Sequence, residues 1–267
     1  MERIGRLRYL DVPASGSGRG AGVLVLIHGF PLNTSMWEPQ LPLAGRGWRV
    51  IVPELRGFGD GRNDPPTTSI DDYAGDTIDL LDKLGIKKDA VICGLSMGGY
   101  AAFAMFKHAA SYFRGMVLAD TRSQGDSPEA VVNRKNMQQL VREKGPGAVA
   151  DALVPKLICE ATQKTKPAVA ESLRAQITGS SVESIVGALT AMMTRPDVTP
   201  MLPSIRIPVQ IVVGAEDGVT PPALSEQMHK DIPGSELVVI PGAGHMSNME
   251  QPALFNEAVG RFLDRRV

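Results

Sequence analysis

Residues 90–102 read AVICGLSMGGYAA. An apolar run, residues 90–93, leads straight into the pattern G-x-S-x-G, and a segment rich in alanine follows it. A strand, a tight turn and a helix in this order are the context in which G-x-S-x-G forms a nucleophile elbow, with its serine exposed at the head of the helix. Gly94 and Gly98 flank the serine, where so tight a turn needs residues with almost no side chain. We therefore predict that Ser96 is a catalytic nucleophile, at a helix N-terminus whose dipole favours developing negative charge.

Short apolar runs alternate with longer amphipathic stretches along most of the chain. This alternation predicts an α/β fold, with a mostly parallel central sheet that is flanked by helices on both faces. The runs that read as strands are Val23–Ile27, Arg49–Val52, Ala90–Cys93, Gly115–Leu118, Val209–Val213 and Glu236–Ile240, with an opening strand near Arg6–Val12. The stretches with helical spacing are Ile70–Leu84, Gly98–Ala109, Pro221–Lys230 and Pro252–Arg265.

One region interrupts this alternation. From Ser127 to about Arg195 there is no convincing strand, and the segments with helical spacing are Pro128–Glu143, Pro167–Ile177 and Val182–Met193. Several prolines follow before the strands resume. We therefore predict a helical insertion in the α/β core.

The strand expected at residues 23–27 runs into a glycine turn, His28-Gly29-Phe30-Pro31. In folds with a nucleophile elbow, this turn supplies one backbone N–H group of the oxyanion hole, and the residue after the nucleophile supplies the other. We expect the N–H groups of Phe30 and Met97 to be these donors. His28 ends the strand, and we interpret it as a residue that holds the turn through hydrogen bonds to the backbone.

Three motifs together carry a resemblance to a known family. They are His28-Gly29-Phe30-Pro31, Pro53-Glu54-Leu55-Arg56-Gly57-Phe58-Gly59 and Gly94-Leu95-Ser96-Met97-Gly98-Gly99. With them the chain resembles the α/β-hydrolase superfamily, and within it carboxylesterases and 3-oxoadipate enol-lactone hydrolases. The resemblance covers nearly the whole chain and is strongest outside the insertion.

This resemblance implies the α/β-hydrolase fold with a helical cap over the active site. The core would comprise residues 1–122 and 200–267, and the cap would comprise residues 123–199. A serine nucleophile argues against the dehalogenase and epoxide hydrolase branches of this fold, which form an alkyl ester on a carboxylate. Many members have aspartate where this chain has Glu54, so the hydrogen bonds made at that position remain open.

A general base is expected among the four histidines of the chain. His245 lies in the glycine-rich loop Pro241-Gly242-Ala243-Gly244-His245, directly after the last expected strand. Loops at the carboxyl edge of a parallel sheet are where such folds place their chemistry, and the order Ser, Asp, His along the chain is that of the α/β hydrolases. We predict that His245 is the base, whereas His108 and His229 fall in helical stretches and are expected at the surface.

Two aspartates compete for the third position of the triad. Asp217 follows the strand at residues 209–213, and Asp120 follows the strand at residues 115–118. Only one carboxylate can hold the imidazole in the required tautomer. We favour Asp217, which matches the usual position in the family, and expect Asp120 to cap the start of the insertion or to pair with Arg122.

Composition limits the possible partners of the chain. Of its 267 residues, 43% are hydrophobic and 21% are charged, as in an ordinary globular enzyme, and the net charge is −1. This charge leaves no basic excess for a nucleic acid or an anionic membrane. The early apolar runs are too short for a signal peptide or a membrane span, so we expect a cytoplasmic protein in which Cys93 and Cys159 are buried thiols.

Neither a metal motif such as H-E-x-x-H nor a dinucleotide motif G-x-G-x-x-G after a strand occurs in the sequence. We therefore expect no cofactor, with water as the co-substrate. The favoured function is a carboxylesterase that cleaves small esters through an acyl-enzyme intermediate. An enol-lactone hydrolase or a perhydrolase could use the same triad, and a non-catalytic small-molecule sensor could keep the same pocket. The sequence predicts no oligomeric state.

Overall fold

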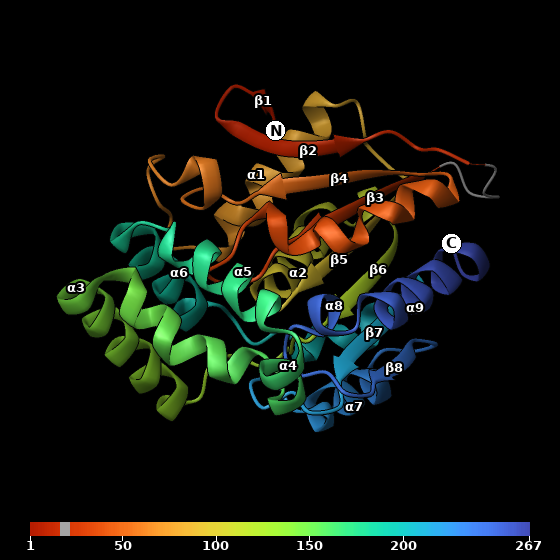
Figure 1. Ribbon diagram of the computed structural model, residues 1–267. Coiled ribbons are helices and arrows are strands. Elements are labelled where there is room, and N and C mark those ends of the chain that lie inside the picture. Colours follow the sequence, from red (N-terminus) through yellow and green to blue (C-terminus); the bar gives the residue numbers. More distant parts are fainter. Residues whose placement is uncertain (17–21) are drawn as a thin grey trace.

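The computed structural model of the protein describes residues 1–16 and 22–267, in which eight strands form one sheet (Figure 1). The strand order is β1-β2-β4-β3-β5-β6-β7-β8. β2 is antiparallel to β1 and β4, and the remaining pairs are parallel. The strands are β1 (Glu2–Ile4), β2 (Leu7–Val12), β3 (Gly22–Ile27), β4 (Trp48–Glu54), β5 (Ala90–Leu95), β6 (Phe113–Ala119), β7 (Val209–Gly214) and β8 (Glu236–Ile240).

Helices cover both faces of this sheet. Figure 1 shows α8 and α9 in front of the sheet and α2 behind it, where α2 packs against β5 and α1. The α-helices outside the insertion are α1 (Ile70–Lys83), α2 (Met97–Ala109), α7 (Pro222–Asp231), α8 (Ser247–Glu250) and α9 (Pro252–Arg265). The 3₁₀ segments are η1 (Thr34–Arg46), η2 (Gly59–Gly61), η3 (Ala110–Tyr112) and η4 (Thr199–Ser204).

The burial of the elements follows from their sequence patterns. Every residue of β5 is buried, as expected for a Val- and Ile-bearing parallel strand that is covered on both faces. Helix α1 begins at an N-cap, Ser69, whose hydroxyl accepts a hydrogen bond from the N–H of Asp71. Its buried residues repeat at helical spacing and are Ile70, Tyr73, Ala74, Asp76, Thr77, Leu80 and Leu81.

The carboxyl ends of four parallel strands lie in register. Leu95 of β5 pairs with Ala119 of β6, and Ala119 pairs in turn with Val212 of β7. Gly214, at the end of β7, pairs with Ile240 of β8. The loops that follow these four strands therefore open at the same edge of the sheet, where α/β folds bind ligands.

The helical insertion between β6 and β7 comprises α3 (Pro128–Leu157), α4 (Glu160–Thr165), α5 (Pro167–Thr178) and α6 (Val182–Thr194). Figure 1 shows these helices gathered beyond the edge toward which β4 points. Helix α3 is longer than the predicted Pro128–Glu143. It breaks at Gly145, whose φ of 76° is outside the helical range and which precedes Pro146, and then resumes.

Two elements near the N-terminus were not predicted from the sequence. β1 forms a hairpin with β2 through a turn in which Gly5 has a φ of 64°. The segment η1 contains Pro39 and Pro42. Proline removes a backbone donor and disfavours a regular α-helix, which explains both the 3₁₀ geometry and the absence of a clear helical pattern.

Candidate active site

Ser96 lies at the turn between β5 and α2, in a strained backbone conformation with φ 54° and ψ −115°. A Cβ atom on Gly94 would lie 2.2 Å from the carbonyl oxygen of Gly98, and a Cβ on Gly98 would lie 2.1 Å from that of Ile27. Both positions therefore need glycine for the turn to close. A non-glycine residue at positive φ costs about 1–3 kcal/mol and is found mainly at functional sites. The geometry is that of the predicted nucleophile elbow.

His245 links Ser96 to Asp217. Its Nε2 lies 2.9 Å from the Oγ of Ser96, and its Nδ1 lies 2.8 Å from the Oδ2 of Asp217. The imidazole and the Asp217 carboxylate are both buried. The structure thus brings together the three side chains that the sequence predicted as a triad, from the loops after β5, β7 and β8.

Further hydrogen bonds fix the orientation of the Asp217 carboxylate. The hydroxyl of Thr220 donates to Oδ2 at 2.6 Å, and the N–H groups of Val219 and Thr220 each donate to Oδ1 at 2.8 Å. Sequence reasoning missed Thr220. Its signal is its spacing, because a hydroxyl three residues after an aspartate can close a turn around the carboxylate.

The ion pair shifts the pKa of both partners. Burial would lower the pKa of His245, but the charge of Asp217 and its hydrogen bond outweigh burial, so that the pKa is raised above 6.5. Burial would raise the pKa of Asp217, but His245 and the hydrogen bonds from Thr220 lower it overall. The arrangement favours an imidazolium that is stabilised by an ionised carboxylate, as a general base requires after it accepts a proton.

Asp120 does not take the role that we expected for it. Arg122 pairs with Asp126 at 2.6 Å instead, and the carboxylate of Asp120 accepts hydrogen bonds from the N–H of Gly214 and the hydroxyl of Ser247. The expectation of a local cap or an Arg122 pair was therefore wrong, because the end of β6 is fully buried beside β7 and turns the carboxylate inward. Burial and the charge of Asp217 raise the pKa of Asp120.

Phe30 and Met97 were predicted to supply the oxyanion donors, from the turn after β3 and from the start of α2. Phe30 lines the same cavity as Ser96, and Met97 is the first residue of α2. Within residues 1–16 and 22–267, neither N–H group takes part in a hydrogen bond. Both are available to an incoming oxyanion.

His28 holds this turn, as expected. Its Nε2 accepts a hydrogen bond from the N–H of Leu55, and its Nδ1 lies 3.0 Å from the carbonyl oxygen of Gly29. Burial lowers the pKa of His28 to about 4, so the ring is neutral and can satisfy both partners.

Glu54 closes the neighbouring loop through its carboxylate. Its carboxylate accepts hydrogen bonds from the N–H groups of Asp60 and Gly61, at 2.9 and 3.2 Å. Burial raises its pKa to about 7, and these two hydrogen bonds oppose that rise. The hydrogen bonds that the sequence left open at this position are thus made within segment η2.

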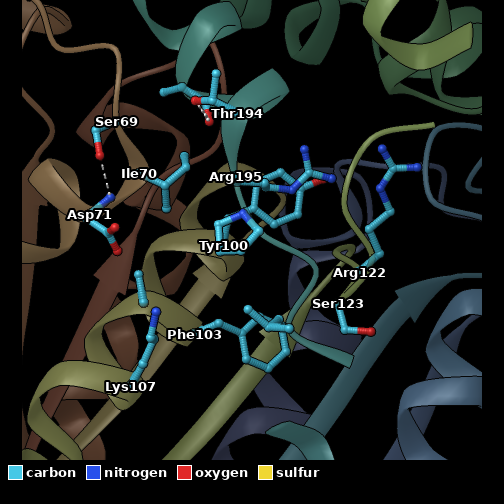
Figure 2. A pocket seen from close by; sticks show the side chains of 14 residues that line it. Ser69, Ile70, Asp71, Tyr100, Phe103, Lys107, Arg122, Ser123, Thr194 and Arg195 are labelled. Carbon is cyan, nitrogen blue, oxygen red and sulfur yellow. Dashed lines mark hydrogen bonds between the residues drawn. The ribbon is translucent and has the colours of Figure 1, made fainter. Parts of the chain in front are cut away.

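Ser96 and His245 open onto a cavity of about 1020 Å³ between the core and the insertion. Its apolar lining from the insertion comprises Met137, Leu140, Leu153, Leu157, Ile158, Leu189 and Met192. Tyr100 and Arg122 line this cavity and also a second hollow of about 60 Å³ (Figure 2). The volume of the larger cavity, which contains Ser96 and His245, is at the upper end of the range for small-molecule sites.

Within the described parts of the chain, 1–16 and 22–267, no group of three or more His, Cys, Asp or Glu side chains could hold a metal ion. In the same residues, no helix is both long and apolar enough to cross a membrane.

Comparison with known proteins identifies the family of the chain and agrees with its fold. The family model described as "Alpha/beta hydrolase family" matches residues 24–258. The chain belongs to the alpha/beta hydrolase family. Among proteins similar to this alpha/beta hydrolase is 3-oxoadipate enol-lactonase 2 of Acinetobacter baylyi, which is 31% identical over 242 residues and aligns over 91% of this chain and 88% of that protein.

Two solved structures are similar to this alpha/beta hydrolase over almost its whole length. A thermophilic esterase from Thermogutta terrifontis is 39% identical with a TM-score of 0.90, and 96% of this chain and 92% of that chain are covered. The enol-lactonase from Burkholderia xenovorans LB400 is 29% identical with a TM-score of 0.85, and 96% of each chain is covered.

Proposed function

We propose that this alpha/beta hydrolase is a carboxylesterase that cleaves small carboxylic esters through an acyl-enzyme intermediate. The observation that carries the proposal is the continuous line of contacts from Ser96 Oγ through His245 to Asp217, at 2.9 and 2.8 Å, at the floor of an open cavity. The similarity to a solved esterase at 39% identity supports the same reaction class.

The proposed mechanism assigns one role to each group. His245 Nε2 accepts the proton of the Ser96 hydroxyl as Oγ attacks the ester carbonyl, while Asp217 holds Nδ1–H and stabilises the imidazolium. The N–H groups of Phe30 and Met97 bind the resulting oxyanion, and one such donor is worth about 10²- to 10³-fold in turnover. The alcohol leaves with the proton from His245, and water then releases the acid by the reverse sequence of proton transfers.

We further propose that residues 123–199 act as a cap over this site, on a core of residues 1–122 and 200–267. The apolar side chains that α3 and α6 contribute to the cavity wall support this role. They would exclude water around the acyl group, which strengthens the electrostatic interactions at the reacting carbonyl. A cavity of about 1020 Å³ exceeds what a short acyl chain requires, so size alone does not limit the substrate to acetate or butyrate esters.

Enol-lactone hydrolysis is the second candidate. Two similar proteins, at 31% and 29% identity, are enol-lactonases. A lactone is an internal ester, so the same attack opens the ring and leaves the alcohol tethered to the acyl group. The triad geometry is equally compatible with both substrates.

A panel of p-nitrophenyl esters and lactones tests the proposal. We expect multiple turnovers on at least one ester series, and a loss on the order of 10⁶-fold for Ser96→Ala, as for the nucleophile of a serine protease. Circular dichroism of the variant checks that the fold is kept. A single slow turnover in the wild type would indicate a sensor, and more than a tenth of wild-type activity in Ser96→Ala would exclude Ser96 as the nucleophile.

A further inference from the structure

Three arginines surround one buried carboxylate where β6 leads into the insertion. The side chain of Asp126 is fully buried and accepts hydrogen bonds from Arg122, at 2.6 Å, and Arg195, at 2.7 Å. Arg134, from α3, donates to the other oxygen. Burial would raise the pKa of Asp126, but Arg134 and Arg195 lower it overall, so this group carries one negative charge.

The cluster has more positive than negative charge. Three guanidinium groups against one carboxylate leave a surplus of two positive charges. Buried or half-buried charges without a partner are costly, and guanidinium groups remain charged at all ordinary pH values. Asp126 is the shared partner of all three, so the surplus makes the surroundings of these arginines positive and favours an anion beside them.

Arg195 is not available to such an anion. Its side chain is only 4% exposed, and it donates hydrogen bonds to the carbonyl oxygens of Met192 and Gln124 as well as to Asp126. Figure 2 shows its guanidinium against the ring of Tyr100, and the distance to the ring centroid is 4.0 Å. Arg195 thus tethers α6 to the core.

Arg122 and Arg134 differ from Arg195 because both line the cavity that contains Ser96 and His245. Their side chains are 20% and 19% exposed. The Nε of Arg122 is buried and has no hydrogen-bond partner within the described residues. The other charged groups along this cavity are Lys156, Glu160 and Glu216, which are all exposed to solvent.

We propose that Arg122 and Arg134 form a carboxylate-binding subsite, and that the preferred substrate is an ester or lactone with a second, free carboxylate. The planar fork of a guanidinium matches the two oxygens of a carboxylate. The subsite would hold the distal end of the acyl group while its carbonyl lies over Ser96. This inference rests on the proposed ester hydrolysis and names its substrate class.

Half-esters and diesters of the same acids provide a direct test. The monoethyl esters of succinic, glutaric and adipic acid carry one carboxylate, and the diethyl esters are their neutral counterparts. We expect kcat/KM for the half-ester to exceed that for the diester by at least about tenfold at one chain length, since hydrogen bonds to charged groups contribute about 1.5–3 kcal/mol. A ratio near one at all three lengths would overturn the proposal.

Variants assign the preference to the two arginines. Arg122→Gln and Arg134→Gln should each lower the ratio of the two kcat/KM values by about tenfold or more, and Arg122→Lys should retain part of it. Arg174→Gln is the matched control, because Arg174 is half exposed, pairs with Asp151 and does not line the cavity. An equal loss in Arg174→Gln, or no loss in either cavity variant, would contradict the proposal.

Binding to Ser96→Ala separates this inference from the proposed function, because that protein keeps the arginines but cannot form an acyl-enzyme. Calorimetric titration should give tighter binding of monoethyl glutarate or adipate than of the diethyl ester, and glutarate should bind more tightly than inorganic phosphate. If the wild type hydrolyses no ester but these affinities hold, the subsite stands and the proposed function fails. Equal affinities for half-ester and diester, or tighter phosphate binding, would reject the carboxylate subsite.

Discussion

The carboxylate of Asp120 accepts a hydrogen bond from the hydroxyl of Ser247, although 127 residues separate the two in the sequence. Its other oxygen accepts the N–H of Gly214 at 2.8 Å. Ser247 lies just after His245, and Gly214 lies just before Asp217. Asp120 therefore joins the two loops that carry the base and the acid.

This arrangement predicts losses of activity of very different size for two aspartate-to-asparagine substitutions. Asp217→Asn places an amide donor where the imidazole needs an acceptor, and we expect kcat to fall by about 10²- to 10⁴-fold. Asp120→Asn can keep both of its hydrogen bonds, because its oxygen accepts from Gly214 and its amide donates to Ser247. We expect a loss of less than about tenfold.

Both variants should be measured on the same p-nitrophenyl ester and corrected for the folded fraction. If Asp120→Asn removes activity and Asp217→Asn does not, the acid of the triad belongs at the end of β6.

The pH dependence of activity follows from the raised pKa of His245. A protonated imidazole cannot accept the serine proton, so kcat/KM should rise with pH and reach half its maximum above pH 6.5. Because Asp217 is the group that raises this pKa, Asp217→Asn should move the midpoint to lower pH. Profiles from pH 5 to 9 at low substrate concentration test this prediction, and a wild-type midpoint below pH 6.5 would contradict it.

Glu54 should make stability depend on pH in a direction unusual for a carboxylate. Its pKa is raised from 4.5 to about 7 in the folded protein, so the folded state binds a proton that the unfolded state releases. The resulting stability is complete below pH 4.5 and is lost as pH rises through 7. The free energy of unfolding of the wild type should therefore fall over this window, relative to Glu54→Gln, by on the order of 1–3 kcal/mol.

Urea unfolding at several pH values measures this difference. Glu171→Gln, at an exposed position of α5, is the control and should track the wild type. An unchanged gap between the wild type and Glu54→Gln from pH 4.5 to 8 would show that burial of Glu54 has no energetic consequence.

Local sequence patterns predicted the elements that carry the site. The elbow at Ser96 was predictable because its strand, glycines and helix are contiguous in the sequence. His245 and Asp217 were predictable because parallel strands deliver their following loops to one edge. The functional roles of these three residues stay predictions until activity is measured.

The features that sequence reasoning missed depend on distant contacts. The partners of Asp120 lie on β7 and α8, and Arg195 reaches Asp126 from the far end of the insertion. No local periodicity encodes such pairs. The predicted helix ended at Glu143, directly before Gly145 and Pro146, which favour a break. The sequence did not predict that the helix resumes beyond this break and continues to Leu157.

The loops that meet at the carboxyl edge of the sheet are synthesised at different times. During synthesis from the N-terminus, the elbow at Ser96 leaves the ribosome before the insertion, whereas Asp217 and His245 follow it. While the insertion is being translated, the chain thus contains Ser96 but neither its proposed base nor its proposed acid. In the proposed mechanism, hydrolysis requires β7 and β8 to have joined the edge of the sheet, so activity would report that residues 209–267 have folded.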